Sequence, residues 1–137
     1  MSRILRILLI DDDADDREIF TWVMKSIDAD LVVEDTSDGF EALDLLKQQN
    51  FDLVFLDLNM PRMHGLECLR RIRQIPQHAG TAVIVYSTSS NPRDLEESQA
   101  AKATDYIVKG HELSLIRSEL TRALKKYDPR LSHTYEK

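Results

Sequence analysis

One stretch of the chain decides the fold, and it reads Phe51-Asp52-Leu53-Val54-Phe55-Leu56-Asp57-Leu58-Asn59-Met60-Pro61. Its apolar run predicts a strand buried on both faces, as in a parallel sheet covered by helices. The run ends on the carboxylate of Asp57, and Pro61 marks the following loop because proline cannot donate to a strand ladder. Taken alone, an aspartate in this place most simply starts a turn. Open α/β sheets, however, bind their ligands at the carboxyl ends of their strands, so the other strand ends decide its role.

Apolar segments on either side of this stretch alternate between strand and helix. Runs of apolar residues predict further strands at residues 4–10, 31–34, 81–86 and 105–108. Helical spacing predicts helices from Asp13 to Ile27, over 40–49, 66–75 and 113–124, and from Asn91-Pro92 onward. This alternation implies parallel βαβ units with right-handed crossovers, hence a three-layer α/β sandwich. The helix that begins at Asn91-Pro92 is only weakly amphipathic, so we expect it to be the most mobile.

Length and composition describe an ordinary globular domain. The chain has 137 residues, 42% of them apolar and 31% charged, so we expect one domain over residues 1–127 and a loose polar tail over 128–137. A net charge of -6 argues against nucleic-acid and anionic-membrane partners. The single cysteine, Cys68, favours a reducing compartment. Arg6 and the acids from Asp11 onward exclude a signal peptide, and no stretch reaches transmembrane length, so we expect a cytoplasmic protein.

Polar side chains gather where the predicted strands end. These ends carry Asp11-Asp12, Asp57, Ser87-Thr88 and Lys109. Because parallel strands point the same way, we expect these side chains to meet at one edge of the sheet. Carboxylates brought together repel one another unless a cation or a proton joins them, and oxygen ligands suit Mg²⁺. A carboxylate in such a site can attack phosphorus, while a lysine and a hydroxyl hold phosphoryl oxygens.

The acidic run after the first strand divides into two parts. Asp13 is well placed to cap the helix that follows, and Asp15 and Asp16 suit the positive end of its dipole. Capping has no use for Asp11 and Asp12, which close the strand. These two acids therefore need another explanation.

Four segments together resemble the receiver domain of two-component response regulators. They are Leu8-Leu9-Ile10-Asp11-Asp12-Asp13, Leu56-Asp57-Leu58-Asn59-Met60-Pro61 with Gly65, Val85-Tyr86-Ser87-Thr88, and Tyr106-Ile107-Val108-Lys109. Each segment alone is weakly specific, but four in the right order on the right strand ends are strongly so. The resemblance runs from about Ile4 to Lys126. It implies a flavodoxin-like (βα)5 fold with strand order 2-1-3-4-5.

The resemblance also implies roles for the strand-end residues. Asp57 matches the phosphoacceptor, and Lys109 matches the lysine that pairs with the phosphoryl group. Asp12 would bind Mg²⁺ directly and Asp11 through water, and the backbone carbonyl of Asn59 would complete the ligands from the protein. Asp57 would itself also contact the metal.

Two further positions match the conformational switch of receivers, and one departs from the family. Ser87 matches the switch hydroxyl and Tyr106 the aromatic residue that changes rotamer with it. The backbone N–H of Thr88 would also donate to phosphate. Receivers usually follow the lysine with a proline, often in a cis bond, whereas Gly110 follows Lys109 here. With glycine at this position, the loop after Lys109 lacks the rigid constraint that a proline imposes.

Other polar candidates are most simply structural. We expect surface positions without a shared metal for the scattered histidines His64, His78, His111 and His133. We expect a solvated helix face for Arg70, Arg71 and Arg73. Cys68, next to Leu69 on the predicted third helix, is expected to be buried packing and not a reactive thiol.

The leading hypothesis is a signalling protein that catalyses only its own phosphorylation and dephosphorylation. The resemblance implies a histidine kinase as partner, Mg²⁺ as cofactor, and output through protein contact or phosphoryl relay. The short chain and Gly110 are similar to the regulators of bacterial phytochrome kinases. A homodimer through the fourth helix, fifth strand and last helix is also implied. About ten residues follow the last helix, too few for an effector domain.

Two other functions are weighed against this one. An Mg²⁺-dependent phosphatase that forms an aspartyl-phosphate commonly carries a second acid two residues after the nucleophile, and Asn59 stands there instead. A nucleotide or flavin binder of the same fold needs a glycine- or hydroxyl-rich first loop to cradle phosphate. The acids at 11–16 would repel that phosphate.

Overall fold

The computed structural model describes residues 4–131. Its strands are β1 (Arg6–Ile10), β2 (Val32–Thr36), β3 (Leu53–Leu56), β4 (Ala82–Ser87) and β5 (Asp105–Val108). Its α-helices are α1 (Ala14–Ile27), α2 (Gly39–Gln48), α3 (Gly65–Gln74), α4 (Pro92–Ala100) and α5 (Leu113–Tyr127), and a 3₁₀ turn follows α3 at Pro76–His78. Strand and helix alternate throughout this part of the chain, as the sequence predicts. None of these helices is both long and apolar enough to cross a membrane.

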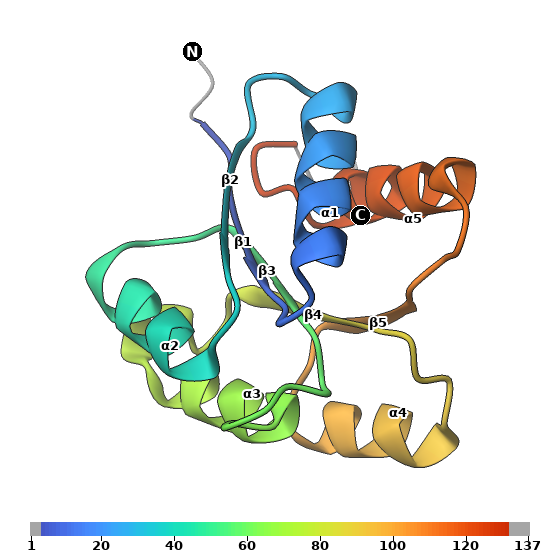
Figure 1. The fold of residues 1–137 in the computed structure, drawn as a ribbon. Helices are drawn as coiled ribbons and strands as arrows, with labels where there is room; N and C mark the ends of the chain where they lie inside the picture. The colour runs from blue at the N-terminus through green and yellow to red at the C-terminus, as the bar shows by residue number, and fades with distance from the viewer. Residues whose placement is uncertain (1–3, 132–137) are drawn as a thin grey trace, which may run out of the picture.

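The strands form one parallel sheet in the order β2-β1-β3-β4-β5. Helices α1 and α5 cover one face of the sheet, and α2, α3 and α4 cover the other (Figure 1). The predicted three-layer, flavodoxin-like α/β fold is thus confirmed. Because every strand points the same way, all carboxyl ends lie along one edge.

Successive residues of the central strands face opposite layers. In β1, Ile7 and Leu9 pack in the cluster beneath α1 and α5, whereas Leu8 and Ile10 pack in the cluster beneath α2 and α3. Every residue of β3 is buried, as expected for a central strand between two helical layers. The strand that carries Asp57 at its end is therefore fixed from both sides.

Two element ends lie beyond their predicted positions. β2 continues to Thr36 because the backbone N–H of Asp11 donates to the Thr36 carbonyl at 3.0 Å and extends the pairing with β1. α5 continues to Tyr127, whose ring packs beneath α1 and α5 and whose hydroxyl donates to Asp105 Oδ2 at 2.5 Å. The last residues of both elements are mostly polar, so the apolar pattern used for the prediction ends before the element does.

Helix α4 is weakly anchored, as its sequence predicts. Of its residues only Ser98 is buried, and Leu95 is 37% exposed. Asn91 caps the helix by accepting the N–H of Arg93 at 2.9 Å. Its greater mobility stays a prediction.

Two side chains expected at the surface are held at the amino edge of the sheet instead. His78 is 1% exposed, with one ring nitrogen 2.8 Å from the Thr81 hydroxyl and the other 3.4 Å from the Gln49 carbonyl. Arg73 is half-buried and donates to the carbonyls of His78, Thr81 and Lys102 at 3.1, 2.6 and 2.8 Å. The surface prediction is wrong for both because each side chain bonds the nearby loop and one carbonyl distant in the chain, that of Gln49 for His78 and that of Lys102 for Arg73.

The remaining expectations for these residue types are largely met. The exposed side chains are those of His64, His111, Arg70 and Arg71, whereas His133 lies outside the described residues. Cys68 is 0% exposed, and burial raises the pKa of its thiol to about 12. An un-ionised buried thiol is a packing residue and a poor nucleophile.

The segment after α5 begins as packed structure. Asp128 is 3% exposed, and Arg130 lies 2.8 Å from its carboxylate and 3.5 Å from that of Asp28 at the end of α1. The expectation of a loose tail from Asp128 onward is therefore wrong for these first residues, because an ion-pair network ties them to α1. Residues 132–137 of the predicted tail lie outside the described part of the chain.

Candidate functional site

Two of the predicted acids are fixed to the sheet by their own backbones. The N–H of Asp11 donates to the Thr36 carbonyl at 3.0 Å, and that of Asp57 to the Ile10 carbonyl at 2.9 Å. Asp11 and Asp57 are 0% and 7% exposed, whereas Asp12 is exposed. Carboxylate oxygens of these three acids all lie within 4.8 Å of one another. The strand ends thus meet as the sequence predicts.

Lys109 reaches this acidic cluster from the end of β5. Its backbone N–H donates to the Ser87 carbonyl at 2.8 Å, which continues the β4–β5 pairing. Its ammonium lies 2.7 Å from Asp11 Oδ2, 2.8 Å from Asp16 Oδ2 and 3.8 Å from Asp57 Oδ2. The Lys109 side chain is only 8% exposed, so its charge is poorly screened by water.

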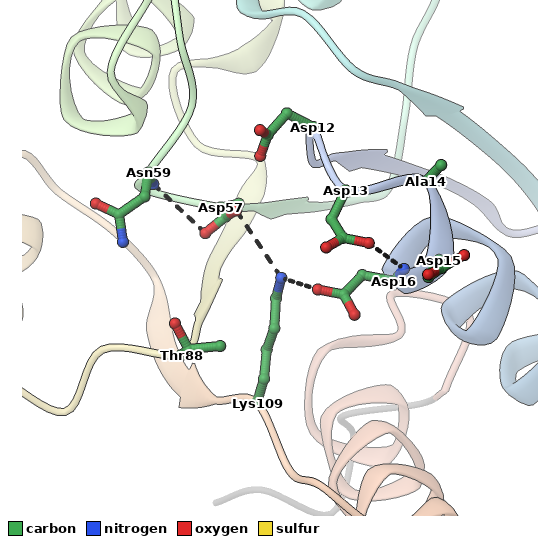
Figure 2. Close-up of a pocket in the computed structure, with 9 residues that line it drawn as sticks. All are labelled: Asp12, Asp13, Ala14, Asp15, Asp16, Asp57, Asn59, Thr88 and Lys109. Atoms are coloured by element: carbon green, nitrogen blue, oxygen red, sulfur yellow. Dashed lines mark hydrogen bonds and ion pairs between the residues drawn. The ribbon is translucent and has the colours of Figure 1, made fainter.

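An open cavity of about 470 Å³ lies over these groups (Figure 2). Its walls come from the start of α1 and from the ends of β3, β4 and β5. The lining residues are Asp12, Asp13, Ala14, Asp15, Asp16, Asp57, Asn59, Thr88 and Lys109. This lining carries several carboxylates and a single cation. An anionic substrate will therefore enter favourably only together with a cation.

The loop after Asp57 is held by the close approach of α3. The N–H of Gly65 donates to the Leu58 carbonyl at 2.8 Å. A Cβ at Gly65 would lie 2.3 Å from the Asp57 carbonyl oxygen and 2.6 Å from Leu58 Cα, which is too close for any other residue. The Asn59 N–H lies 3.5 Å from Asp57 Oδ1 and faces that carboxylate. Glycine at 65 thus fixes the backbone that presents Asp57.

Burial dominates the electrostatics of Asp57. It raises the pKa of this carboxyl from 3.8 to about 6, against the opposing effect of Lys109, and the carboxylates of Asp11 and Asp12 raise it further. Burial alone would lower the pKa of Lys109, but its hydrogen bonds to Asp11 and Asp16 outweigh that effect and raise it. Lys109 is therefore charged at neutral pH. The Asp57 carboxylate would be stabilised by a further cation.

The predicted switch residues lie beside the cavity and not in its lining. Ser87 is 0% exposed, and its hydroxyl accepts the N–H of Ser89 at 3.2 Å. The hydroxyl of half-buried Tyr106 donates to the Ser89 carbonyl at 2.8 Å. Both side chains thus hold the loop that leads from β4 into α4. The hydroxyl residue in the lining is the neighbouring Thr88 (Figure 2).

The donor set fits a divalent cation of the Mg²⁺ type. The carboxylates of Asp11, Asp12 and Asp57 supply oxygen ligands close enough to share one ion, with no histidine or cysteine in the group. Three carboxylates lie within 3.8 Å of the Lys109 ammonium, and Asp12 adds a further negative charge to the cluster. The surplus negative charge is what a doubly charged cation would neutralise.

Comparison with known families supports this interpretation of the site. The model of the response regulator receiver domain matches residues 7–121. The chain belongs to the response regulator receiver family. The resemblance drawn from the four sequence segments is thereby confirmed. The matched region is a receiver domain of two-component signalling and not a separate enzyme.

Solved structures and curated relatives agree with this assignment. The chemotaxis response regulator CheY4 of Vibrio cholerae is 30% identical with a TM-score of 0.79, over 89% of this chain and 100% of that one. The phosphorylated cyanobacterial phytochrome response regulator RcpA is 26% identical with a TM-score of 0.85, over 95% and 98% of the two chains. The gliding motility regulatory protein of Myxococcus xanthus is 33% identical over 106 residues, 77% of this chain and 13% of that protein. The receiver spans about a third or less of such curated relatives.

Gly110 of this receiver has a packing reason in place of the usual proline. Among the described residues no peptide bond is cis. A Cβ at Gly110 would lie 2.9 Å from Leu115 Cδ2 and 3.0 Å from its Cγ. The absence of a side chain thus lets Leu115, in the first turn of α5, fold back over the loop after Lys109.

One residue of the site is missed by sequence reasoning. Asp16 pairs with Lys109, although the sequence explains its charge fully by the dipole of α1. Asp13 does cap this helix, because its Oδ1 accepts the N–H of Asp16 at 3.0 Å. The first turn of α1 directly follows the strand end at Asp11, and this proximity is the signal that pointed to the site.

Proposed function

We propose that this receiver accepts a phosphoryl group on Asp57 from a histidine kinase in an Mg²⁺-dependent reaction and signals through altered protein contacts. One observation carries the proposal. Asp57 stands in an open cavity within 4.8 Å of two further carboxylates and 3.8 Å from a buried lysine ammonium. That is the set of groups that phosphoryl transfer to a carboxylate requires.

Each group then has a role in the transfer. A carboxylate oxygen of Asp57 attacks phosphorus, a P–O bond forms, and the P–N bond to the donor imidazole breaks. Lys109 has three N–H donors, two of which are engaged, and the third is free for a phosphoryl oxygen. Bound Mg²⁺ supplies charge neutralisation at the phosphoryl oxygens. We assign its ligands to Asp12 directly, Asp11 through water, Asp57, and the Asn59 backbone carbonyl.

Intact mass after incubation with a small phosphodonor tests this proposal. The unmutated receiver gains one phosphoryl group in Mg²⁺ and none after chelation. Asp57→Asn gains none, whereas Asp44→Asn, at an exposed position on α2, behaves as the unmutated chain. Stoichiometric modification of Asp57→Asn in the presence of Mg²⁺ would overturn the assignment.

The output face is proposed to be α4, β5 and α5, for binding a partner or a second copy. Two observations support it. Ser87 and Tyr106 both hold Ser89, which lies just before α4, so a movement of either side chain acts on that loop. Helix α4 has only Ser98 buried and offers little resistance to a shift. A phosphoryl group adds about -1.5 to -2 charges and draws Lys109 and a hydroxyl toward it.

Hydrogen exchange with and without a phosphate mimic tests the output face. Altered protection is expected around Asn91, Tyr106 and Lys109. Protection changes confined to α1 and α2 would contradict the proposed output face. Repeating the exchange at several receiver concentrations distinguishes a homodimer from binding to another protein. Only self-association makes the protection depend on the concentration of the receiver.

We further propose a phytochrome-type kinase as donor, on the likeness to RcpA and on Gly110. We keep the cytoplasm as location because Cys68 is a free, buried thiol. We propose Tyr127, the last residue of α5, as the end of the domain's regular secondary structure. Phosphoryl transfer from a purified phytochrome kinase, compared with an unrelated kinase, would test the donor class.

A further inference from the structure

The ammonium of Lys109 is committed to two carboxylates and not to the proposed phosphoacceptor. It donates to Asp11 Oδ2 at 2.7 Å and to Asp16 Oδ2 at 2.8 Å. Asp57 Oδ2 lies at 3.8 Å, beyond hydrogen-bond length. The dashed lines in Figure 2 show this lysine between Asp16 and Asp57. The lysine thus sits closer to the start of α1 than to Asp57.

Asp16 differs from the other acids that contact this lysine. Asp11 belongs to the carboxylate group that suits a metal ion, and Asp16 does not. Asp16 is fixed in place, because its N–H is bound by the Asp13 cap in the first turn of α1. Its side chain is 36% exposed, so the position could hold other polar residues without a burial penalty. Its carboxylate contacts the ammonium of Lys109 at 2.8 Å.

We propose that Asp16 is a positioning residue that draws the Lys109 ammonium away from Asp57 and so weakens the hold of the site on a phosphoryl group. A carboxylate in contact with an ammonium competes for it with any anion placed at Asp57. Without Asp16, Lys109 keeps its bond to Asp11 and has two N–H donors free. It then moves to hydrogen-bond distance of Asp57, or of a phosphoryl oxygen on Asp57. The inference rests on the proposed function of Asp57.

Beryllofluoride, a stable mimic of the phosphoryl group, provides the binding test at saturating Mg²⁺. We expect Asp16→Asn to bind it about tenfold more tightly than the unmutated receiver, because the lysine is released and one negative charge is removed. The matched control is Glu18→Gln, which removes the same charge from an exposed residue of the same helix that lies outside the cavity lining. It should change the affinity less than about twofold, because surface charges are well screened. Asp16→Glu keeps a carboxylate within reach of Lys109 and should restore most of the original affinity.

A crystal structure of Asp16→Asn without metal or mimic tests the position of the lysine independently. The Lys109 Nζ to Asp57 Oδ2 distance should shorten from 3.8 Å to hydrogen-bond length. Equal affinities of Asp16→Asn and Glu18→Gln, or an unmoved lysine, would overturn the proposal. If the unmutated receiver binds no beryllofluoride while the lysine still moves in the variant, the proposed function fails and the positioning role stands.

Discussion

The two edges of the sheet handle charge in opposite ways. At the amino edge, Arg73 donates to three backbone carbonyls, and Arg6 pairs with Glu34 at 2.7 Å, so the cations there are matched by acceptors. At the carboxyl edge, three carboxylates lie within 3.8 Å of the Lys109 ammonium, and Asp12 adds a fourth to the cluster. The paired cations at the amino edge stabilise the fold. The excess of carboxylates at the carboxyl edge is suited to binding a cation together with a phosphoryl group. The unbalanced edge is the functional one.

The largest effect on stability is expected from removal of Lys109. Without metal, Lys109→Met should lower the free energy of unfolding by about 3 kcal/mol, because the buried acids Asp11 and Asp57 lose the cation that lies beside them. Mg²⁺ should restore part of this loss by neutralising the same carboxylates. Urea denaturation with and without Mg²⁺ measures both effects. A cost well below 1 kcal/mol would mean that the carboxylates are not coupled through this lysine.

Removal of Arg73 should have a smaller effect that does not respond to metal. Arg73→Met leaves carbonyls at the amino edge without their donor, which should cost about 2 kcal/mol. The same denaturation series should give equal costs with and without Mg²⁺. Arg70→Met, at an exposed position on the same helix, should stay within about 0.5 kcal/mol of the unmutated chain. If Mg²⁺ rescued Arg73→Met, the separation of the two edges would be wrong.

The pKa of Asp57 predicts that Asp57→Asn stabilises the metal-free receiver at neutral pH. Burial raises this pKa from 3.8 to about 6, so ionisation of Asp57 weakens the fold as pH rises through this interval. An amide carries no such charge. We expect a gain of up to about 3 kcal/mol above pH 6, since a pKa rise from 3.8 to about 6 at about 1.4 kcal/mol per pKa unit corresponds to that free energy.

Unfolding measured from pH 4 to pH 8 checks this prediction. The two proteins should converge toward pH 4, where Asp57 is largely protonated, and diverge above pH 6. A gain that does not change with pH would point to packing and not to charge. Mg²⁺ should remove the advantage of the variant, because only the ionised carboxylate binds the metal well.

The smallest expected effects on stability come from the neighbouring acids Asp12 and Asp13, which differ in their effect on Mg²⁺ binding. Asp12→Ala should weaken Mg²⁺ binding strongly with little cost to the fold, because this exposed carboxylate belongs to the metal group. Asp13→Ala should cost about 0.5–2 kcal/mol, because it loses the cap of α1, and should leave most of the Mg²⁺ affinity. Metal titration followed by Tyr or Trp fluorescence compares them. Equal losses of affinity would show that the register of the acidic run is misread.

Strand ends were predictable from the sequence because topology alone brings them together. An apolar run that stops at an acid marks its place on the carboxyl edge, and Asp11, Asp57 and Lys109 follow from that rule. His78 and Arg73 were not predictable in this way, because each also bonds a carbonyl distant in the chain, that of Gln49 for His78 and that of Lys102 for Arg73. Such contacts depend on how the finished layers sit together and leave no periodic pattern.

The pairing of Asp16 shows a subtler limit. An acid in the first turn of a helix already has a sufficient local explanation in the helix dipole, so only its closeness in sequence to Asp11 indicates that it lies near the site. For Gly65 the sequence predicts the location of the residue but not its packing role. The sequence marks it as a loop residue, whereas its absent side chain lets α3 lie against the backbone of Asp57.

Chemical trapping of the modified residue tests the central claim most directly. After incubation with phosphodonor and Mg²⁺, borohydride reduces an aspartyl-phosphate to homoserine, and peptide mass spectrometry then locates the reduced residue. The unbalanced carboxyl edge predicts homoserine at position 57 alone, with none formed when Mg²⁺ is chelated. Homoserine at Asp11, Asp12 or Asp16 in place of Asp57, or equal yields without Mg²⁺, would contradict it.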